Sequence, residues 1–315
     1  MSRPVVAVVG PTATGKSDLG LELAAALGGE VVNADAMQLY RGMDVGTAKL
    51  RPGARRGVPH HQLDVLDVEQ DATVAAYQRH ARADVAAVLA RGARPVVVGG
   101  SGLYVRALLD RIEFPPADPV VRAELEQEAV ERGPGLLHDE LARLDPLAAS
   151  RVDRANTRRI VRALEVVRIT GRPYSATLPE HLYAVPAVQI GLDCDRAVLD
   201  QRIEARVARM WREGLVDEVR GLAPRLGRTA ARAVGYAEVL QALRGETTEG
   251  EARAAVVVGT RRLARRQMSW FGRDPRVHWL DARDPDLAAR ALRLVAAADD
   301  GALADPGQRD RRLGS

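Results

Sequence analysis

The first third of the chain alternates short apolar runs with amphipathic segments. The apolar runs have the length of buried strands, and the segments between them carry apolar residues at helical spacing. The expected strands are 5–9, 30–33 and 95–98, and the expected helices are 17–27, 72–89 and one from about residue 103. Buried strands that alternate with helices are typical of a parallel sheet with helices on both faces. We therefore predict an α/β fold for this part of the chain.

The pattern changes at the proline-rich stretch 115–119, since the next fifty or so residues are charged and helical with no clear strand. Strand character returns at 188–192, and a helix is expected from Arg196. The simplest organisation is an α/β core with a helical domain inserted into it. The predicted parts are a core of 1–114 and 187–298, an all-helical insertion of 115–186, and a disordered tail of 299–315 that is rich in Asp, Gly and Arg.

Composition narrows the class of protein. The chain has 315 residues, 46% of them apolar, which suits a folded protein with room for two domains. No apolar run reaches the length of a membrane span, and the first residues do not resemble a signal peptide, so we expect a cytoplasmic protein without membrane contact. The single cysteine, Cys194, excludes an intramolecular disulfide and a cysteine-rich metal site.

Positive charge is carried almost entirely by arginine, because Lys16 and Lys49 are the only lysines. The net charge is only +4, but residues 151–172 contain seven arginines against two carboxylates. Arg151, Arg154, Arg158 and Arg162 follow steps of three and four, which predicts one stripe along a helix. Such a stripe suits a nucleic-acid backbone, although a solvated helix face has the same pattern.

A second arginine cluster, at 261–266, is followed by Trp270 and Phe271. Aromatic side chains beside arginines can stack on unpaired bases. They can equally form part of the core beneath a helix.

The most specific motif lies between the first strand and the first helix. Residues 10–17 fit the phosphate-loop pattern G-x-x-x-x-G-K-[ST], in which backbone N–H groups at a helix start hold phosphate oxygens. Lys16 adds a positive charge for a terminal phosphate, and the Ser17 hydroxyl can bind Mg²⁺. An ordinary glycine-rich turn is the alternative. The predicted phosphate-binding residues are Gly10, Pro11, Thr12, Ala13, Thr14, Gly15, Lys16 and Ser17.

Asp35 and Ser101 follow two other predicted strands and so lie at the same edge of the sheet as the loop. Asp35 can orient a hydroxyl or bind metal in a kinase, accept a proton from a nucleophile, or cap a helix. His60 and His61 have no further ligand set at metal-binding spacing, so we interpret them as structural or close to the substrate.

Several blocks along the chain, in one order, resemble the bacterial tRNA dimethylallyltransferases. The similarity runs from about residue 5 to 281, nearly the whole chain, and the block from Asn33 to Lys49 is its most particular part. The matching blocks are 10–17, 33–49, 59–64 (Pro-His-His-Gln-Leu-Asp), 99–104 (Gly-Gly-Ser-Gly-Leu-Tyr), 162–166, 234–236 and 260–267.

The resemblance implies transfer of a dimethylallyl group from dimethylallyl diphosphate to N6 of adenine 37, in tRNAs that read codons beginning with U. The phosphate loop then holds the donor's diphosphate, with Lys16 and a Mg²⁺ ion on Ser17 neutralising the leaving group. Asp35 accepts the N6 proton. Ser101, where the family usually has threonine, lies near the adenine, and Arg232 occupies the place of a family arginine that reaches the diphosphate.

The resemblance also implies that the target adenine is flipped out of the anticodon loop and that the helical insertion clamps the anticodon stem-loop. The residues expected to contact tRNA are Asp35, Ala36, Met37, Gln38, Ser101, Arg122, Arg158, Arg159, Arg162, Gly235 and Tyr236. We expect a monomer. Two alternatives remain open from the residues alone: an ATP-dependent small-molecule kinase, and a nucleotide-gated RNA-binding module without catalysis.

Overall fold

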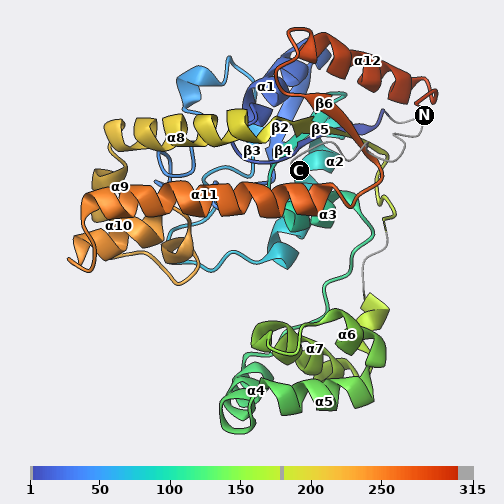
Figure 1. Ribbon diagram of the computed structural model, residues 1–315. Helices are drawn as coiled ribbons and strands as arrows, with labels where there is room; N and C mark the ends of the chain where they lie inside the picture. Colours follow the sequence, from blue (N-terminus) through green and yellow to red (C-terminus); the bar gives the residue numbers. More distant parts are fainter. Residues whose placement is uncertain (1–2, 178–180, 304–315) are drawn as a thin grey trace. The chain divides into compact units, whose positions relative to one another are not determined.

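The computed structural model describes residues 3–177 and 181–303 and divides the chain into two compact units (Figure 1). The first unit joins residues 1–109 to 183–315, and the second is Asp110–Leu182. The predicted tail lies largely outside the described residues, which reach only the end of the last helix and four residues beyond it. Among the described helices, none combines the length and the low charge that a membrane crossing requires.

A parallel six-stranded sheet forms the centre of the first unit. Its strands are β1 (Val5–Val9), β2 (Gly29–Asn33), β3 (His60–His61), β4 (Arg94–Gly99), β5 (Ala187–Asp193) and β6 (Val277–Asp281). The spatial order is β3-β2-β4-β1-β5-β6, with Val8 of the central strand β1 beside Val98 of β4 and Ile190 of β5. The predicted α/β fold is confirmed, although β3 and β6 were not predicted.

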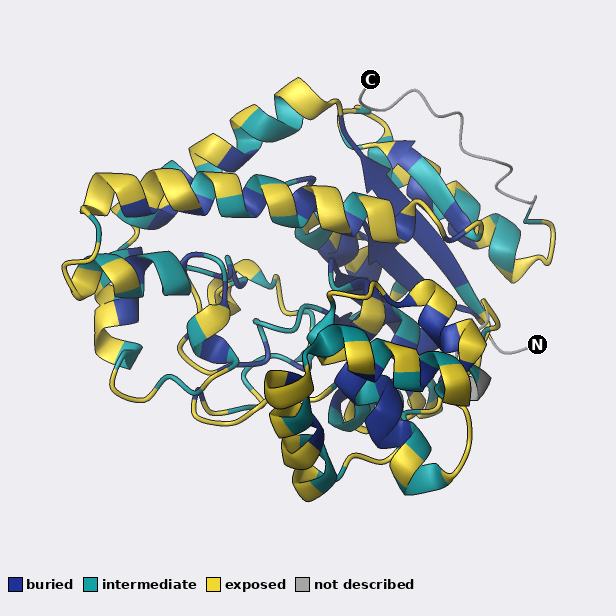
Figure 2. Ribbon diagram, turned by 60° about the horizontal axis from the view of Figure 1, so that its bottom comes forward, coloured by how far each residue is buried: buried dark blue, intermediate teal, exposed yellow. Residues whose placement is uncertain are grey.

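Helices cover both faces of this sheet. The helices α1 (Lys16–Leu27) and α12 (Leu287–Asp299) pack on one face, and α2 (Val74–Ala90) and α3 (Gly102–Leu109) pack on the other. The remaining helices of this unit are α8 (Arg196–Arg212), α9 (Leu215–Leu222), α10 (Tyr236–Leu243) and α11 (Glu249–Phe271), with short 3₁₀ turns η1 (Pro52–Ala54) and η3 (Ala230–Arg232). The core beneath α2 and α3 includes Val97 and Phe271, and the core beneath α1 and α12 includes Val98 and Val295. Figure 2 shows the consequence: the central strands are buried, whereas the helices expose one side.

The second unit is entirely helical, in agreement with the sequence. Its helices are α4 (Pro119–Arg132), α5 (Pro134–Leu144), α6 (Pro146–Arg151) and α7 (Thr157–Thr170), followed by the 3₁₀ turn η2 (Tyr174–Thr177). Proline occupies the first turn of α4, α5 and α6, where its missing N–H costs nothing, and the side chains of Asp118, Asp145 and Asn156 cap α4, α6 and α7. Leu125, Leu137, Leu141, Ile160 and Leu164 form its core.

The boundaries of this unit lie four or five residues before the predicted ones. Tyr183 and Val185 pack against the core of the first unit, and the Arg276 guanidinium lies 4.1 Å from the centre of the Tyr183 ring. The returning chain therefore joins the first unit at Tyr183, earlier than the strand pattern indicated.

The predicted single arginine stripe is wrong. Helix α6 ends at Arg151, and α7 begins only at Thr157 after the Asn156 cap. Arg154 lies in the turn between them, where its guanidinium pairs with Asp139. The spacing rule failed because Asp153 and Asn156 can satisfy backbone N–H groups locally and so interrupt a helix.

Candidate functional site

The loop of residues 10–17 connects β1 to α1, as the motif predicts. Gly10 has φ of 132°, and a Cβ there would lie 2.6 Å from the carbonyl oxygen of Leu192 on β5, so only glycine fits. Gly15, with φ of 90°, turns the chain into α1, and Ala13 also adopts a positive φ of 65°. This backbone aims the start of α1 at the space beyond the carboxyl ends of the strands.

Contacts within the protein occupy the polar groups of this loop. Lys16 Nζ donates to the Pro11 carbonyl at 2.6 Å, and Thr14 Oγ1 donates to the same oxygen at 2.8 Å. The Thr12 N–H donates to Gln267 Oε1, from α11, at 2.8 Å. A phosphate at this loop would therefore compete with Gln267 for the Thr12 N–H.

A cavity opens in front of the loop. Its polar wall includes Thr12, Lys16, Ser17, Asp35, Arg206 and Gln267, and its apolar wall includes Val31, Leu50 and Leu63. The structure thus brings the phosphate loop and Asp35 together, as the sequence predicts.

The charges in the cavity are unbalanced towards positive. Burial, with a smaller contribution from Arg206, lowers the pKa of Lys16 to about 7, and Asp35 opposes this shift. Burial also lowers the pKa of Arg206, again opposed by Asp35. Two basic groups that face one carboxylate in a desolvated space favour the arrival of an anion.

Asp35 sits at the end of β2 in a fixed orientation. Its Oδ1 accepts from the Met37 N–H at 3.0 Å, and its own N–H donates to Asn33 Oδ1 at 3.0 Å. Ser101 Oγ accepts from the Ala36 N–H at 3.3 Å, which joins the ends of β2 and β4. One carboxylate oxygen of Asp35 has no hydrogen bond among these contacts and remains available for a proton.

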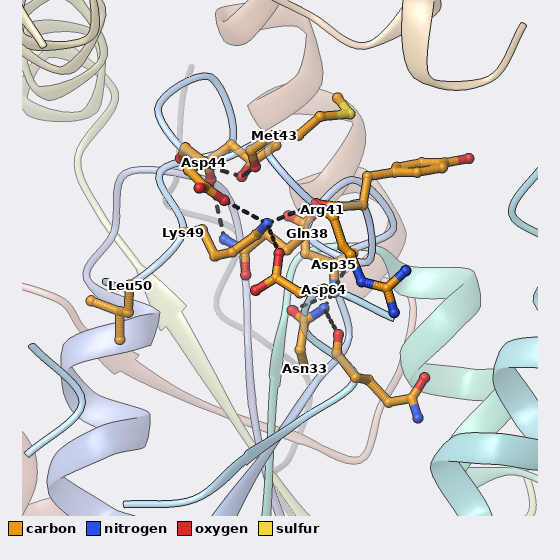
Figure 3. Close-up of polar contacts among 12 residues, drawn as sticks. Asn33, Asp35, Gln38, Arg41, Met43, Asp44, Lys49, Leu50 and Asp64 are labelled. Carbon is orange, nitrogen blue, oxygen red and sulfur yellow. Dashed lines mark hydrogen bonds and ion pairs between the residues drawn. The ribbon is translucent and has the colours of Figure 1, made fainter. Parts of the chain in front are cut away.

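The segment from Ala36 to Leu50 covers this edge of the sheet, and Lys49 holds it in place (Figure 3). Lys49 Nζ donates to the Tyr40 carbonyl, to Asp44 and to Asp64 at 2.6–2.7 Å, and its side chain is 3% exposed. The second lysine of the chain is therefore structural. Gln38 Nε2 donates to the Thr47 carbonyl, so Gln38 is held by the same segment.

Trp270 and Phe271 have different surroundings. Phe271 is 2% exposed and belongs to the core, whereas Trp270 is 39% exposed. A Cβ on Gly102 would lie 2.0 Å from the Trp270 indole, so the indole rests directly on the start of α3, next to Ser101. The sequence left open whether these aromatic side chains are available for stacking or belong to the core. In the structure Phe271 belongs to the core, whereas Trp270 is partly exposed.

Three expected site residues do not line the cavity. Tyr236 is fully buried, with its hydroxyl bonded to Glu218, so its contact with tRNA stays a prediction that the exposed surface does not support. Gly235 is buried too, and its N–H donates to Glu238. Arg232 lies exposed on η3 and is not among the residues that line the cavity.

Arg206 and Gln267 are two polar cavity residues that the sequence analysis did not select as site residues. Arg206 is at steps of four and three from Arg202 and Arg209, and no carboxylate of α8 stands three or four residues from it. The lack of a carboxylate partner for Arg206 within α8 was a usable signal, although Arg209 of the same stripe pairs with Glu213. Gln267 lay within the matching block 260–267, but nothing in its type distinguishes it from a surface residue.

In the second unit, two of the four arginines expected to contact tRNA are bound to Glu165. This carboxylate is fully buried and accepts from Arg122 and Arg162 as well as from the Asp118 N–H. Burial opposes its ionisation, but these bonds outweigh burial and lower the pKa of Glu165. Arg162 also donates to the carbonyls of Pro115 and Pro116. Arg158 and Arg159 are exposed near the start of α7.

Replacing Glu165 by glutamine should destabilise the second unit by about 2–3 kcal/mol, because two guanidinium groups would lose their charged partner. Hydrogen exchange of the backbone amides in residues 110–182 measures this locally. Glu126→Gln, at an exposed position of α4, is the matched control. Equal exchange in both variants would show that Glu165 does not hold the unit together.

The described residues offer few side chains that could together bind a metal ion. Within residues 3–177 and 181–303, no group of three or more His, Cys, Asp or Glu side chains could hold a metal ion. His61 pairs with Glu30 at 2.6 Å, and burial lowers the pKa of His60, whose Nδ1 lies 2.8 Å from the Val58 carbonyl. Ser17 lines the cavity beside Lys16, so it fits a Mg²⁺ that takes its other ligands from phosphate oxygens and water.

The fold and the loop define a class: α/β proteins with a parallel sheet flanked by helices, in which a loop of the phosphate-loop pattern joins the first strand to the first helix. The family model for IPP transferase matches residues 38–274. The chain belongs to this family. It is 62% identical over 286 residues to a tRNA dimethylallyltransferase of Streptomyces avermitilis, covering 90% of this chain and 92% of the relative, and 59% identical over 304 residues to that of Thermobifida fusca (94% and 95%).

Two solved structures are similar to this chain. The full-length tRNA isopentenylpyrophosphate transferase of Bacillus halodurans superposes with a TM-score of 0.70 at 38% identity, covering 95% of this chain and 98% of the other. A eukaryotic dimethylallyltransferase acting on tRNA gives a TM-score of 0.84 at 23% identity, covering 99% and 82%, which supports the fold.

Proposed function

We propose that this protein transfers a dimethylallyl group from dimethylallyl diphosphate to N6 of adenine 37 in the anticodon loop of tRNAs that read codons beginning with U. The observation that carries the proposal is the cavity beside the phosphate loop that Lys16, Arg206 and Asp35 line together. Membership of the IPP transferase family supports the same reaction.

The residues suit each part of this transfer. The C1–O bond of the donor breaks, and its electron pair leaves with diphosphate, whose growing charge meets Lys16, Arg206 and the loop amides. The N6–C1 bond forms, and the N6 proton passes to the free oxygen of Asp35. Ser101 stands beside Asp35 across the ends of β2 and β4, where its hydroxyl can position the adenine.

Ser17 is the residue that would hold Mg²⁺, which when bound supplies further positive charge to the diphosphate. The apolar wall of Val31, Leu50 and Leu63 can exclude water from the donor. Exclusion matters because water would otherwise compete with N6 for the allylic carbon.

The RNA side of the proposal rests on both units. The exposed indole of Trp270, next to Ser101, offers a stacking surface for an unpaired base. In the second unit, Arg158 and Arg159 are exposed and suit the backbone of the anticodon stem. We propose that the protein acts as a monomer in the cytoplasm.

Replacing Arg158 and Arg159 together by alanine should weaken tRNA binding and reduce the slope of log K against log salt by about 1.5, since two phosphate contacts would be lost. Arg154→Ala is the control, because its guanidinium already pairs with Asp139. Filter binding across a salt series measures both slopes. Equal slopes for the double variant and the unchanged protein would remove these residues from the RNA interface.

The function itself is tested by incubating the protein with dimethylallyl diphosphate, Mg²⁺ and unmodified tRNA, followed by nucleoside analysis. We expect N6-(dimethylallyl)adenosine and free diphosphate. A kinase would leave the nucleosides unchanged and consume ATP instead, and a binding module would retain tRNA without changing it.

A further inference from the structure

Glu218, on α9, binds the segment that covers the candidate site at residues 44–46. Its Oε2 accepts the N–H groups of Asp44 and Val45 at 3.0 and 2.7 Å, and its Oε1 accepts that of Gly46 at 3.0 Å. The Tyr236 hydroxyl donates to Oε1 as well. One carboxylate thus receives four donors, three of them consecutive backbone amides.

Only a carboxylate satisfies this arrangement. Backbone N–H groups cannot accept a hydrogen bond, and burial together with the Glu218 charge raises the pKa of Tyr236, so its phenol stays a donor. A glutamine would place its NH₂ group against at least one of the three backbone N–H groups. The Tyr236 ring also fits tightly on the loop, because a Cβ on Gly46 would lie 2.4 Å from it.

The segment held by Glu218 leads directly to the cavity. Thr47 follows Gly46, and its carbonyl oxygen accepts from Gln38 Nε2 at 3.1 Å and from Arg206 Nη2 at 3.3 Å. The Thr47 hydroxyl donates to the Met43 carbonyl at 2.6 Å, which closes the turn. The orientation of Arg206 towards Lys16 and Asp35 therefore depends on the place of one carbonyl.

We propose that Glu218 is a positioning residue for the reaction: by fixing the amides of residues 44–46, it places the Thr47 carbonyl that orients Arg206 towards the diphosphate. This inference rests on the proposed function, because it assigns to Arg206 a contact with the donor's leaving group. Glu218 itself touches no substrate.

The test is a double-mutant cycle on the full chain, with inorganic diphosphate as the probe. Glu218→Gln should weaken the affinity for diphosphate by about tenfold, measured by calorimetry well below the unfolding temperature. In an Arg206→Gln background, Glu218→Gln should add less than about twofold, since the group it positions is gone. If Glu218→Gln acted only by loosening the fold, it would weaken diphosphate binding by the same factor with and without Arg206.

Asp217→Asn is the matched control, because Asp217 is the neighbouring residue on α9, is 80% exposed in its side chain and pairs with Arg220. If Glu218→Gln fails to fold, Tyr236→Phe removes one of the four donors and should lower diphosphate affinity in the same direction by a smaller factor. The proposal is overturned if Glu218→Gln, or Tyr236→Phe in its place, binds diphosphate as tightly as the Asp217→Asn control. It is also overturned if Glu218→Gln lowers diphosphate affinity by the full factor in the Arg206→Gln background. Failure of the unchanged protein to bind diphosphate would instead contradict the proposed function.

Discussion

Asp35→Asn is expected to lower the rate of dimethylallyl transfer by about 10²-fold or more, while the protein still binds tRNA and diphosphate. Asparagine can keep the bond from the Met37 N–H, because its side-chain oxygen occupies the place of Oδ1. What it loses is the free oxygen that takes the N6 proton. Single-turnover transfer from dimethylallyl diphosphate to tRNA measures the chemical step.

The same variant gives a second expected result, for the affinity of the protein for diphosphate. Asp35 partly neutralises Lys16 and Arg206, so its removal should leave diphosphate affinity unchanged or slightly higher. Asp67→Asn, an exposed position paired with Arg41, is the control for the loss of one negative charge. Unchanged single-turnover rates in Asp35→Asn would exclude Asp35 as the proton acceptor.

Lys16→Met is expected to lower kcat/KM for the donor by about 10³-fold, since the variant loses a positive charge in a desolvated site. The pH dependence follows from the pKa of Lys16, about 7 in the ligand-free protein. Above this pH, diphosphate binding must bring a proton to Lys16, so affinity should fall as pH rises, by at most about tenfold per pH unit. Calorimetry in buffers of different ionisation enthalpy detects that proton, and Lys16→Met should show neither the uptake nor this part of the slope.

Lys16, which favours diphosphate binding, should lower the folding stability of the ligand-free protein. The pKa of Lys16 is 10.5 in an exposed setting and about 7 when folded, so between these values the unfolded chain binds more protons. Stability of the ligand-free protein therefore rises with pH across this window, and below pH 7 the buried charge costs the most. Lys16→Met should consequently melt at a higher temperature at pH 6 while being inactive. A lower melting temperature would show that the Lys16 charge is not desolvated.

The fold and half of the site could be predicted from the sequence because their signals are local. Residues 5–17 carry strand, turn and helix start in a single motif, and Asp35 follows an apolar run whose end must lie at the same sheet edge. The two-residue strand β3 has no period to detect, and β6 mixes buried and half-buried positions.

The remaining features depend on tertiary contacts. Tyr236 looked like a ligand residue in a matching block, but its burial against Gly46 and Glu218 depends on how α9 and α10 pack on the 36–50 segment. Arg162 and Glu165 are three residues apart on α7, but Arg122 joins them only because α4 lies along α7. Arg206 enters the site from α8, far along the chain from the loop it faces. No sequence period reports such distant pairings.

A crystal structure of the protein with a non-reactive analogue of dimethylallyl diphosphate and an anticodon stem-loop tests the central claim most directly. The account predicts the diphosphate on the amides of residues 12–17 beside Lys16, with the free oxygen of Asp35 within hydrogen-bonding distance of N6 of the flipped adenine. A diphosphate bound elsewhere, or an Asp35 carboxylate turned away from the adenine, would contradict it.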